Sequence, residues 1–171
     1  MKPIPFDICV LTAANESQAK GYRQQLEWRH HHFSKQTDFK VFADPGGKRI
    51  GSGGSTFYVL NELYAEYGEA LFSKRTLILH SGGDSRRLPA YATVGKIFMP
   101  LPTKKHQTLF DVMLENYSCL PNPAGGQVVI TSGDVLLNFD PAYVGFSSTG
   151  VTGVAYAENP SEGEFFGVYV V

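Results

Sequence analysis

The sequence predicts an α/β domain in which helices cover both faces of a mostly parallel β-sheet. Short apolar, β-branched runs alternate with longer segments of helical periodicity, and glycine-rich turns separate them. The chain has 171 residues, of which 43% are hydrophobic, so it is long enough for one globular core. We therefore expect a single domain over residues 1–171.

The expected strands are short runs rich in Val, Ile and Leu, at residues 7–13, 39–43, 76–79 and 127–131. Helical spacing of apolar residues predicts helices over 16–33, 56–67 and 108–119. Asn15 fits the cap of the first helix, Gly68 the end of the second, and Pro121 the stop after the third.

Three further apolar runs are expected to be extended. Residues 97–101 precede Pro102 and predict a short extended segment, whereas 151–157 and 165–171 predict two more strands. The last run continues to the final residue without a turn or cap, so we expect the domain to be incomplete at its C-terminus.

Charge and composition exclude some classes of partner. Fifteen Lys and Arg residues face 16 Asp and Glu, so no strong positive field is available to bind nucleic acid or an anionic membrane. No signal-like segment or 18-residue apolar stretch occurs. Cys9 and Cys119 lie in apolar runs and are expected to be buried, reduced thiols. These features favour a cytoplasmic protein that binds small molecules or proteins.

A glycine loop follows the strand expected at 76–79, and His80 is expected to lie beneath it. Adjacent glycines permit positive φ and let backbone N–H groups point at phosphate oxygens. The expected phosphate cradle consists of Ser81, Gly82, Gly83 and Asp84. Arg86 or Arg87 would add charge-assisted hydrogen bonds to a triphosphate, and Lys96 would neutralise an α-phosphate under attack.

A second glycine-rich segment, residues 44–56, connects a strand to a helix. Its five glycines cost about 0.5–1 kcal/mol each relative to alanine in an ordered element, so a ligand is expected to approach this backbone. The segment lacks the sixth-position glycine of the dinucleotide fingerprint and the Gly-Lys-Ser/Thr ending of a P-loop.

Asp134 follows the apolar strand expected at 127–131. A carboxylate at the carboxyl end of a parallel strand faces the crevice in which α/β sheets bind ligands. One or two carboxylates together with phosphate oxygens form the usual environment of Mg²⁺. Asp134 is therefore the predicted metal ligand.

Residues 79–89 followed by 95–101 resemble the signature of sugar-phosphate nucleotidyltransferases, although Ser85 replaces a loop glycine and Gly95 replaces a proline. With 10–20, 44–56 and 132–135, nearly the whole chain resembles the N-terminal region of the fucokinase/GDP-fucose pyrophosphorylase family.

This resemblance implies a Rossmann-like nucleotidyltransferase domain of the GT-A-like type. It implies transfer of a guanylyl group from GTP to a sugar 1-phosphate, L-fucose 1-phosphate, with Mg²⁺ as cofactor and pyrophosphate as the second product. A sugar kinase domain would follow in the full-length protein. The residues expected on the base are Gly51, Gly53, Gly54, Ser55 and Thr56. The alternative is a non-catalytic nucleotide-binding or docking module of an L-fucose kinase.

The order of the motifs predicts a rearranged sheet. In ordinary sugar nucleotidyltransferases the phosphate loop follows the first strand and the base-contacting segment comes later, but here residues 50–56 precede residues 81–89. Our hypothesis is that residues 7–67 supply the two middle strand-helix units and residues 76–119 supply the phosphate-loop unit. Both glycine segments would then flank one nucleotide.

Overall fold

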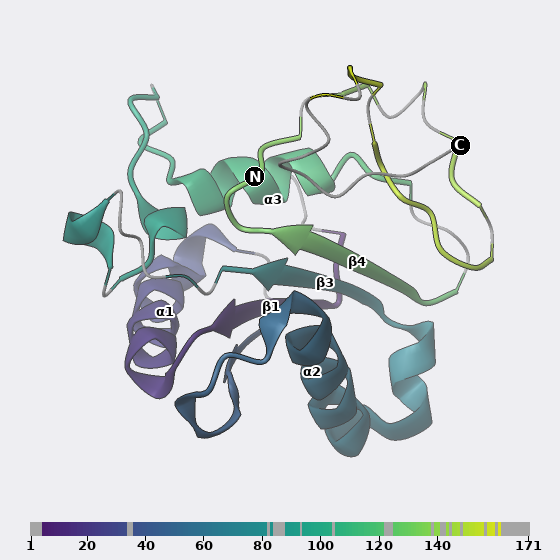
Figure 1. The fold of residues 1–171 in the computed structure, drawn as a ribbon, viewed down its shortest axis with the longest axis horizontal. Coiled ribbons are helices and arrows are strands. Elements are labelled where there is room, and N and C mark those ends of the chain that lie inside the picture. The colour runs from purple at the N-terminus through teal and green to yellow at the C-terminus, as the bar shows by residue number, and fades with distance from the viewer. Residues whose placement is uncertain are drawn as a thin grey trace. The chain divides into compact units, whose positions relative to one another are not determined.

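The computed structural model describes most of the chain (Figure 1). The described residues are 5–33, 36–81, 83, 88–92, 94–103, 105–121, 125–137, 139, 140, 143, 145–147, 149–155, 157–159 and 161. Two compact units, Met1–Pro141 and Ala142–Val171, divide the chain. The named helices and strands belong to the first unit.

The described residues of the first unit form four strands and three α-helices. In chain order they are β1 (Ile8–Ala13), α1 (Glu16–Arg29), β2 (Asp38–Ala43), α2 (Gly51–Tyr67), β3 (Arg75–His80), α3 (Leu109–Tyr117) and β4 (Gln127–Ser132). Short 3₁₀ helices cover His30–His32, Pro45–Gly47, Gly68–Ser73, Pro89–Tyr91 and Lys96–Phe98. All four strands confirm the sequence prediction to within one residue at either end.

Local hydrogen bonds fix the starts of two helices. The Asn15 side chain accepts from the Gln18 N–H at the start of α1. Thr108 and Asp111 form a reciprocal capping box at the start of α3. These side chains satisfy N–H groups that a helix start otherwise leaves without partners.

Two expectations, about a helix end and an extended segment, are corrected. Helix α1 ends at Arg29 rather than at residue 33, and a 3₁₀ turn follows. Residues 97–101 were expected to be extended, but Lys96–Phe98 is a 3₁₀ helix, and only Pro100 makes an isolated bridge, to Thr108.

Residues 151–155 and 157 carry no strand, contrary to expectation. Val151 is 98% exposed, and a β-branched run without a neighbouring strand gains little from its β-propensity. The strand expected over 165–171 lies outside the described residues. Cys9 is buried as expected, but Cys119 is exposed because it lies beyond the last turn of α3.

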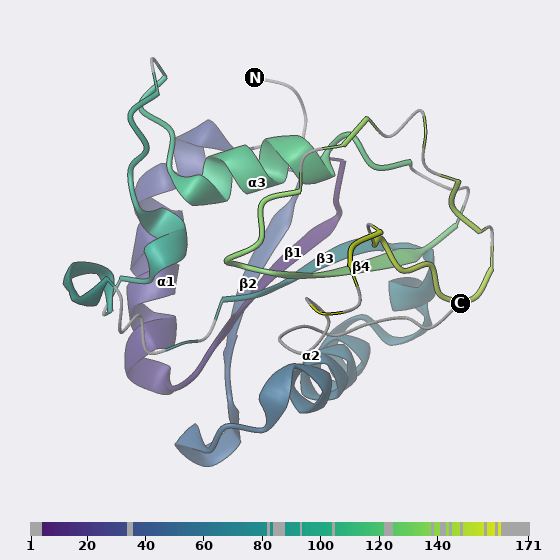
Figure 2. The same cartoon turned by 45° about the horizontal axis from the view of Figure 1, so that its top comes forward.

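The sheet is all parallel, with the order β2-β1-β3-β4. Helices α1 and α3 cover one face, and α2 covers the other (Figure 2). The connection from β3 to β4 runs over the same face as the one from β1 to β2 but in the opposite direction, so its hand is reversed. About 98% of parallel crossovers are right-handed, which makes this reversal unusual.

The predicted rearrangement accounts for the reversed crossover. If β3 is counted as the first strand, followed by β1, β2 and β4, the order across the sheet reads 3-2-1-4, as in the common doubly wound sheet. Helix α3 then lies on the face where the helix of a phosphate-loop unit belongs. The sheet therefore agrees with the rearranged order expected from the sequence.

The core has two layers, one on each face of the sheet. All six residues of β1 are buried. Toward α2, Ile8, Val10 and Ile78 pack against Val59 and Leu63. On the other face the buried side chains come from β1, β3, α1 and α3, and include Leu11, Leu77, Leu79, Tyr22, Phe110 and Met113.

Arg75 closes the amino end of the sheet. It is 3% exposed, and its guanidinium donates to the carbonyls of Pro5 and Leu120 at 2.9 Å and to Gln127 Oε1 at 2.8 Å. The same group lies over the Phe6 ring, 4.4 Å from its centroid. One buried cation thus joins the segments that precede β1 and β4 to the start of β3.

Arg75→Ala should lower the free energy of unfolding by about 3 kcal/mol or more, because it leaves buried carbonyl groups without donors. Urea denaturation measures this change. The exposed Lys48 offers a control, and Lys48→Ala should change the free energy of unfolding by less than about 0.5 kcal/mol. Equal stability of the two variants would contradict the role given to Arg75.

Candidate functional site

A cavity of about 220 Å³ lies at the carboxyl edge of the sheet. Its lining comes from the ends of three strands and the start of α2: Thr12, Ala13, Ala14, Asp44, Arg49, Gly51, Ser52, Ser55 and His80. The chain leaves β1 toward α1 on one face and leaves β2 toward α2 on the other. Such divergence opens the crevice in which doubly wound sheets bind ligands. We call this space the carboxyl-edge cavity.

The start of α2 forms one wall of this cavity. Residues 51–56 were expected to form a loop, and this is wrong, because α2 begins at Gly51. Ile50 precedes the helix without a side-chain cap, and the first turn has no acidic residue. The first-turn N–H groups and the positive end of the helix dipole therefore favour an anion.

Gly53 is not required by packing. Its φ is not in the left-handed region, and an added Cβ would meet nothing within 4 Å. Gly51 differs, because its φ of +75° favours glycine. Its neighbour Ser52 lines the carboxyl-edge cavity, so a glycine that the fold does not need at this point is consistent with close approach of a ligand to the backbone. The contact of residues 51–56 with a base remains a prediction.

His80 joins two walls of the carboxyl-edge cavity. Its Nδ1 lies 3.2 Å from Thr12 Oγ1 at the end of β1, and its Nε2 lies 2.8 Å from Thr56 Oγ1 in α2. Burial lowers the pKa of His80, and the charge of Asp44 opposes this effect. The ring is therefore neutral at neutral pH, and one nitrogen donates while the other accepts.

Helix α1 supports the start of the predicted phosphate cradle. Ser81 Oγ donates to the carbonyl of Thr12 at 2.8 Å, and the carbonyl of Ser81 accepts from Tyr22 at 2.8 Å. The carbonyl of Gly83 accepts from Gln18 Nε2 at 3.1 Å. The other predicted members of this loop, Gly82, Asp84, Arg86 and Arg87, lie outside the described residues.

The two glycine segments reach the carboxyl edge from opposite faces of the sheet. Gly53 belongs to α2, and Gly83 is bound to α1. The two segments meet at the end of β3, where His80 bonds to α2 and Ser81 bonds to β1. A ligand that touches both segments must lie across this end of the strand.

Lys96 and Asp134 lie together, beyond the ends of β3 and β4. Lys96 Nζ donates to Asp134 Oδ2 at 2.8 Å, and Ser132 Oγ donates to Asp134 Oδ1 at 2.5 Å. Both bonds hold the pKa of Asp134 below its ordinary value, Lys96 contributing the larger share. The backbone N–H of Gly133 donates to the His80 carbonyl at 2.9 Å, which connects this pair to the end of β3.

Gly95 brings Lys96 to this position. Its φ is +83°, and an added Cβ would lie 2.2 Å from Cε1 of Tyr22. The chain therefore passes the buried Tyr22 ring in a conformation and at a distance that only glycine permits. This explains the departure from the proline of the signature in terms of packing.

Asp134 is a suitable ligand for Mg²⁺ only together with a bound substrate. Among the residues that the structure describes, no group of three or more His, Cys, Asp or Glu side chains comes together to hold a metal ion. The Asp134 side chain is 55% exposed, so its carboxylate can reach an ion that phosphate oxygens also bind.

The sequence analysis did not identify Asp44 as a site residue. Its carboxylate lines the cavity after β2, in the same way that Asp134 follows β4. The signal was present, because each aspartate lies within two residues of the end of a strand. The supporting roles of Gln18 and Tyr22 left no such signal, since α1 has the pattern of an ordinary covering helix.

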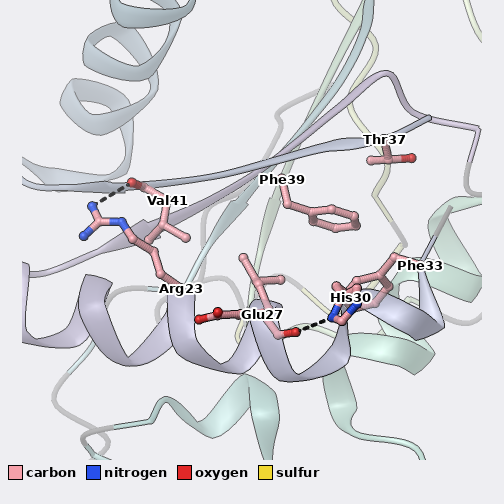
Figure 3. Close-up of a pocket in the computed structure, with 8 residues that line it drawn as sticks. Arg23, Glu27, His30, Phe33, Thr37, Phe39 and Val41 are labelled. Carbon is pink, nitrogen blue, oxygen red and sulfur yellow. Dashed lines mark hydrogen bonds between the residues drawn. The ribbon is translucent and has the colours of Figure 1, made fainter. Parts of the chain in front are cut away.

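A larger pocket of about 500 Å³ lies between α1 and the edge strand β2. Figure 3 shows Phe39 beside Val41 on β2 and Phe33 beside His30, with Arg23 and Glu27 projecting from α1. We call it the α1–β2 pocket. None of the predicted site residues lines it.

The chain resembles proteins of one family. The family model for the fucose pyrophosphorylase domain matches residues 68–171. A mouse protein named fucose-1-phosphate guanylyltransferase is 33% identical over 97% of this chain and 29% of its own length, and the human protein of that name gives the same identity over 28%. A Bacteroides fragilis protein named L-fucokinase/L-fucose-1-P guanylyltransferase is 34% identical over 78% of this chain and 16% of its own length.

The chain thus spans less than a third of the length of these relatives. No solved structure matches it significantly. Among the described residues, no helix is long and apolar enough to cross a membrane.

Lys96→Met should raise the pKa of Asp134 toward its ordinary value, because the variant removes the donor that most favours the carboxylate. NMR titration of the carboxyl carbon measures this change. In the wild type, the depressed pKa means that the pair stabilises the fold above the ordinary aspartate range and loses this effect as pH falls through the folded-state pKa.

Lys105 provides the matched control, since it pairs with Glu115 at 3.7 Å. Lys105→Met should leave the titration of Asp134 unchanged. An unchanged Asp134 pKa in Lys96→Met would show that the two side chains do not pair in solution.

Proposed function

The chain belongs to the fucose pyrophosphorylase family, and on that premise we propose that it forms the nucleotide-binding part of an enzyme that converts GTP and L-fucose 1-phosphate to GDP-fucose and pyrophosphate. One observation carries this proposal. Lys96 Nζ donates to Asp134 Oδ2 at 2.8 Å near the carboxyl edge of the sheet, the edge that both glycine segments reach. This places a cation and an anion suited to phosphoryl chemistry beside the proposed nucleotide site. The names of the mouse and human relatives support the choice of substrates.

The nucleotide in this proposal lies across the ends of β1 and β3. Ser81, Gly82, Gly83 and Asp84 bind its phosphates through backbone N–H groups. The start of α2, Gly51 to Thr56, contacts the base. Asp44 is placed to accept hydrogen bonds from ribose hydroxyls or base N–H groups, as an acidic residue after a strand does in related sheets.

Positioning and charge stabilisation account for catalysis in this scheme. An oxygen of the sugar 1-phosphate attacks the α-phosphorus of GTP in line, and the bond to the β-phosphate oxygen breaks to release pyrophosphate. Lys96 turns from Asp134 to the α-phosphate and neutralises its developing charge, aided by Arg86 or Arg87. Asp134, freed from Lys96, would hold Mg²⁺, and the ion would supply neutralisation of phosphate charge.

The full-length protein is proposed to carry a sugar kinase domain as well. The names of the B. fragilis relative and of a relative from Arabidopsis thaliana, bifunctional fucokinase/GDP-fucose pyrophosphorylase, combine the two activities. A kinase that makes L-fucose 1-phosphate would supply the acceptor of the transferase. The balanced charge of the chain fits small-molecule substrates of this kind. A cytoplasmic location is part of the same proposal.

Release of pyrophosphate tests the activity directly. The full-length protein is incubated with Mg²⁺, L-fucose 1-phosphate and one of GTP, ATP, UTP or CTP, and pyrophosphate is measured. We expect release with GTP and only when the sugar phosphate is present. Binding of GTP without release under these conditions would favour the non-catalytic module instead.

Lys96→Ala in the full-length protein should lower kcat by on the order of 100-fold or more, because charge stabilisation in the transition state is lost. Steady-state pyrophosphate release measures kcat. Lys105 pairs with Glu115, neither of which is a predicted site residue, and serves as the control. The kcat of Lys105→Ala should match that of the wild type. Wild-type turnover in Lys96→Ala would remove this residue from the mechanism.

A further inference from the structure

The first turn of α2 is a weak helix start. It contains Gly53 and Gly54, each costing about 1 kcal/mol relative to alanine in a helix, and it has no side-chain cap. Ser55 is the first buried residue of the helix, and Val59 is the next. Little in the helix itself therefore holds this turn in place, although its N–H groups form a wall of the carboxyl-edge cavity.

The bond from Thr56 to His80 holds this turn from outside the helix. His80 Nε2 meets Thr56 Oγ1 at 2.8 Å, and the same ring meets Thr12 Oγ1 at 3.2 Å. Thr12 is 4% exposed and belongs to the buried central strand β1, so its position is fixed by the sheet. The imidazole thus connects the start of α2 to the ends of β1 and β3.

We propose that His80 is a positioning residue, which sets nucleotide affinity by holding the glycine-rich start of α2 against the ends of β1 and β3. The proposal rests on the nucleotide site proposed above. Both ring nitrogens bond to threonine hydroxyls, so neither is available for proton transfer to a substrate. His80 therefore acts through the helix start rather than on the reacting atoms.

Two amide variants separate the two bonds of the ring. A glutamine amide reaches about as far as Nε2, so His80→Gln keeps the bond to Thr56. An asparagine amide reaches only about as far as Nδ1, so His80→Asn keeps the bond to Thr12 and loses the one to α2. Thr56→Val removes the same bond from the other side.

Thr76 offers a matched control on the same face of β3. Its Oγ1 is buried without a hydrogen-bond partner among the described residues. Thr76 lies four residues before His80. Thr76→Val therefore makes the same chemical change as Thr56→Val but removes no hydrogen bond between described residues.

The first measurement is amide hydrogen exchange of residues 54–56, the first amides of α2 that can bond within the helix, in the full-length protein without nucleotide, with global stability measured alongside. Exchange should be faster in Thr56→Val and His80→Asn and close to the wild-type rate in His80→Gln and Thr76→Val. Equal exchange in all four variants would overturn the proposal, whatever the protein binds.

The second measurement is the Kd for GTP with Mg²⁺ by calorimetry, together with kcat. Thr56→Val and His80→Asn should weaken GTP binding about tenfold, the effect of losing about 1.4 kcal/mol, with a smaller change in kcat. Wild-type affinity in these variants despite faster exchange would overturn the proposed role. If the wild type itself bound no GTP, the proposed function would fail, and hydrogen exchange alone would decide whether His80 holds α2.

Discussion

The candidate site depends on the pairing of β1 with β3, two buried strands that are neighbours in the sheet but not in the chain. Their register places Thr12 beside His80. The side chain of His80 then reaches Thr56, and the side chain of Ser81 reaches the carbonyl of Thr12. Because β2 and α2 lie between these strands in the sequence, this single pairing brings both glycine-rich segments to one edge of the sheet.

Helix α1 covers the sheet and also contacts the segment that follows β3. The fully buried Tyr22 binds the Ser81 carbonyl and leaves room only for glycine at residue 95, so one side chain contacts both ends of the segment 81–95. Lys96 follows that glycine and reaches Asp134 at the end of β4. The exposed ion pair is worth little to stability, so its position at the carboxyl edge is better explained by chemistry than by folding.

The sequence predicted the four strands of the sheet well because their signals are local. It missed the start of α2, since glycine disfavours helix, and burial of Ser55, Val59 and Leu63 overrides that preference. It identified Lys96 and Asp134 separately, but not as a pair. They are 38 residues apart, and their contact follows from the register of β3 with β4 and from a glycine packed on Tyr22, which no local pattern encodes.

The central claim is that one nucleotide binds across the carboxyl ends of β1 and β3. Amide chemical shifts of the ¹⁵N-labelled protein during titration with GTP and Mg²⁺ test it most directly. The account predicts that the amides of Gly53, Gly83 and Gly133 shift together with one saturation curve. Shifts confined to the α1–β2 pocket, at Leu26 and Phe39, would contradict it.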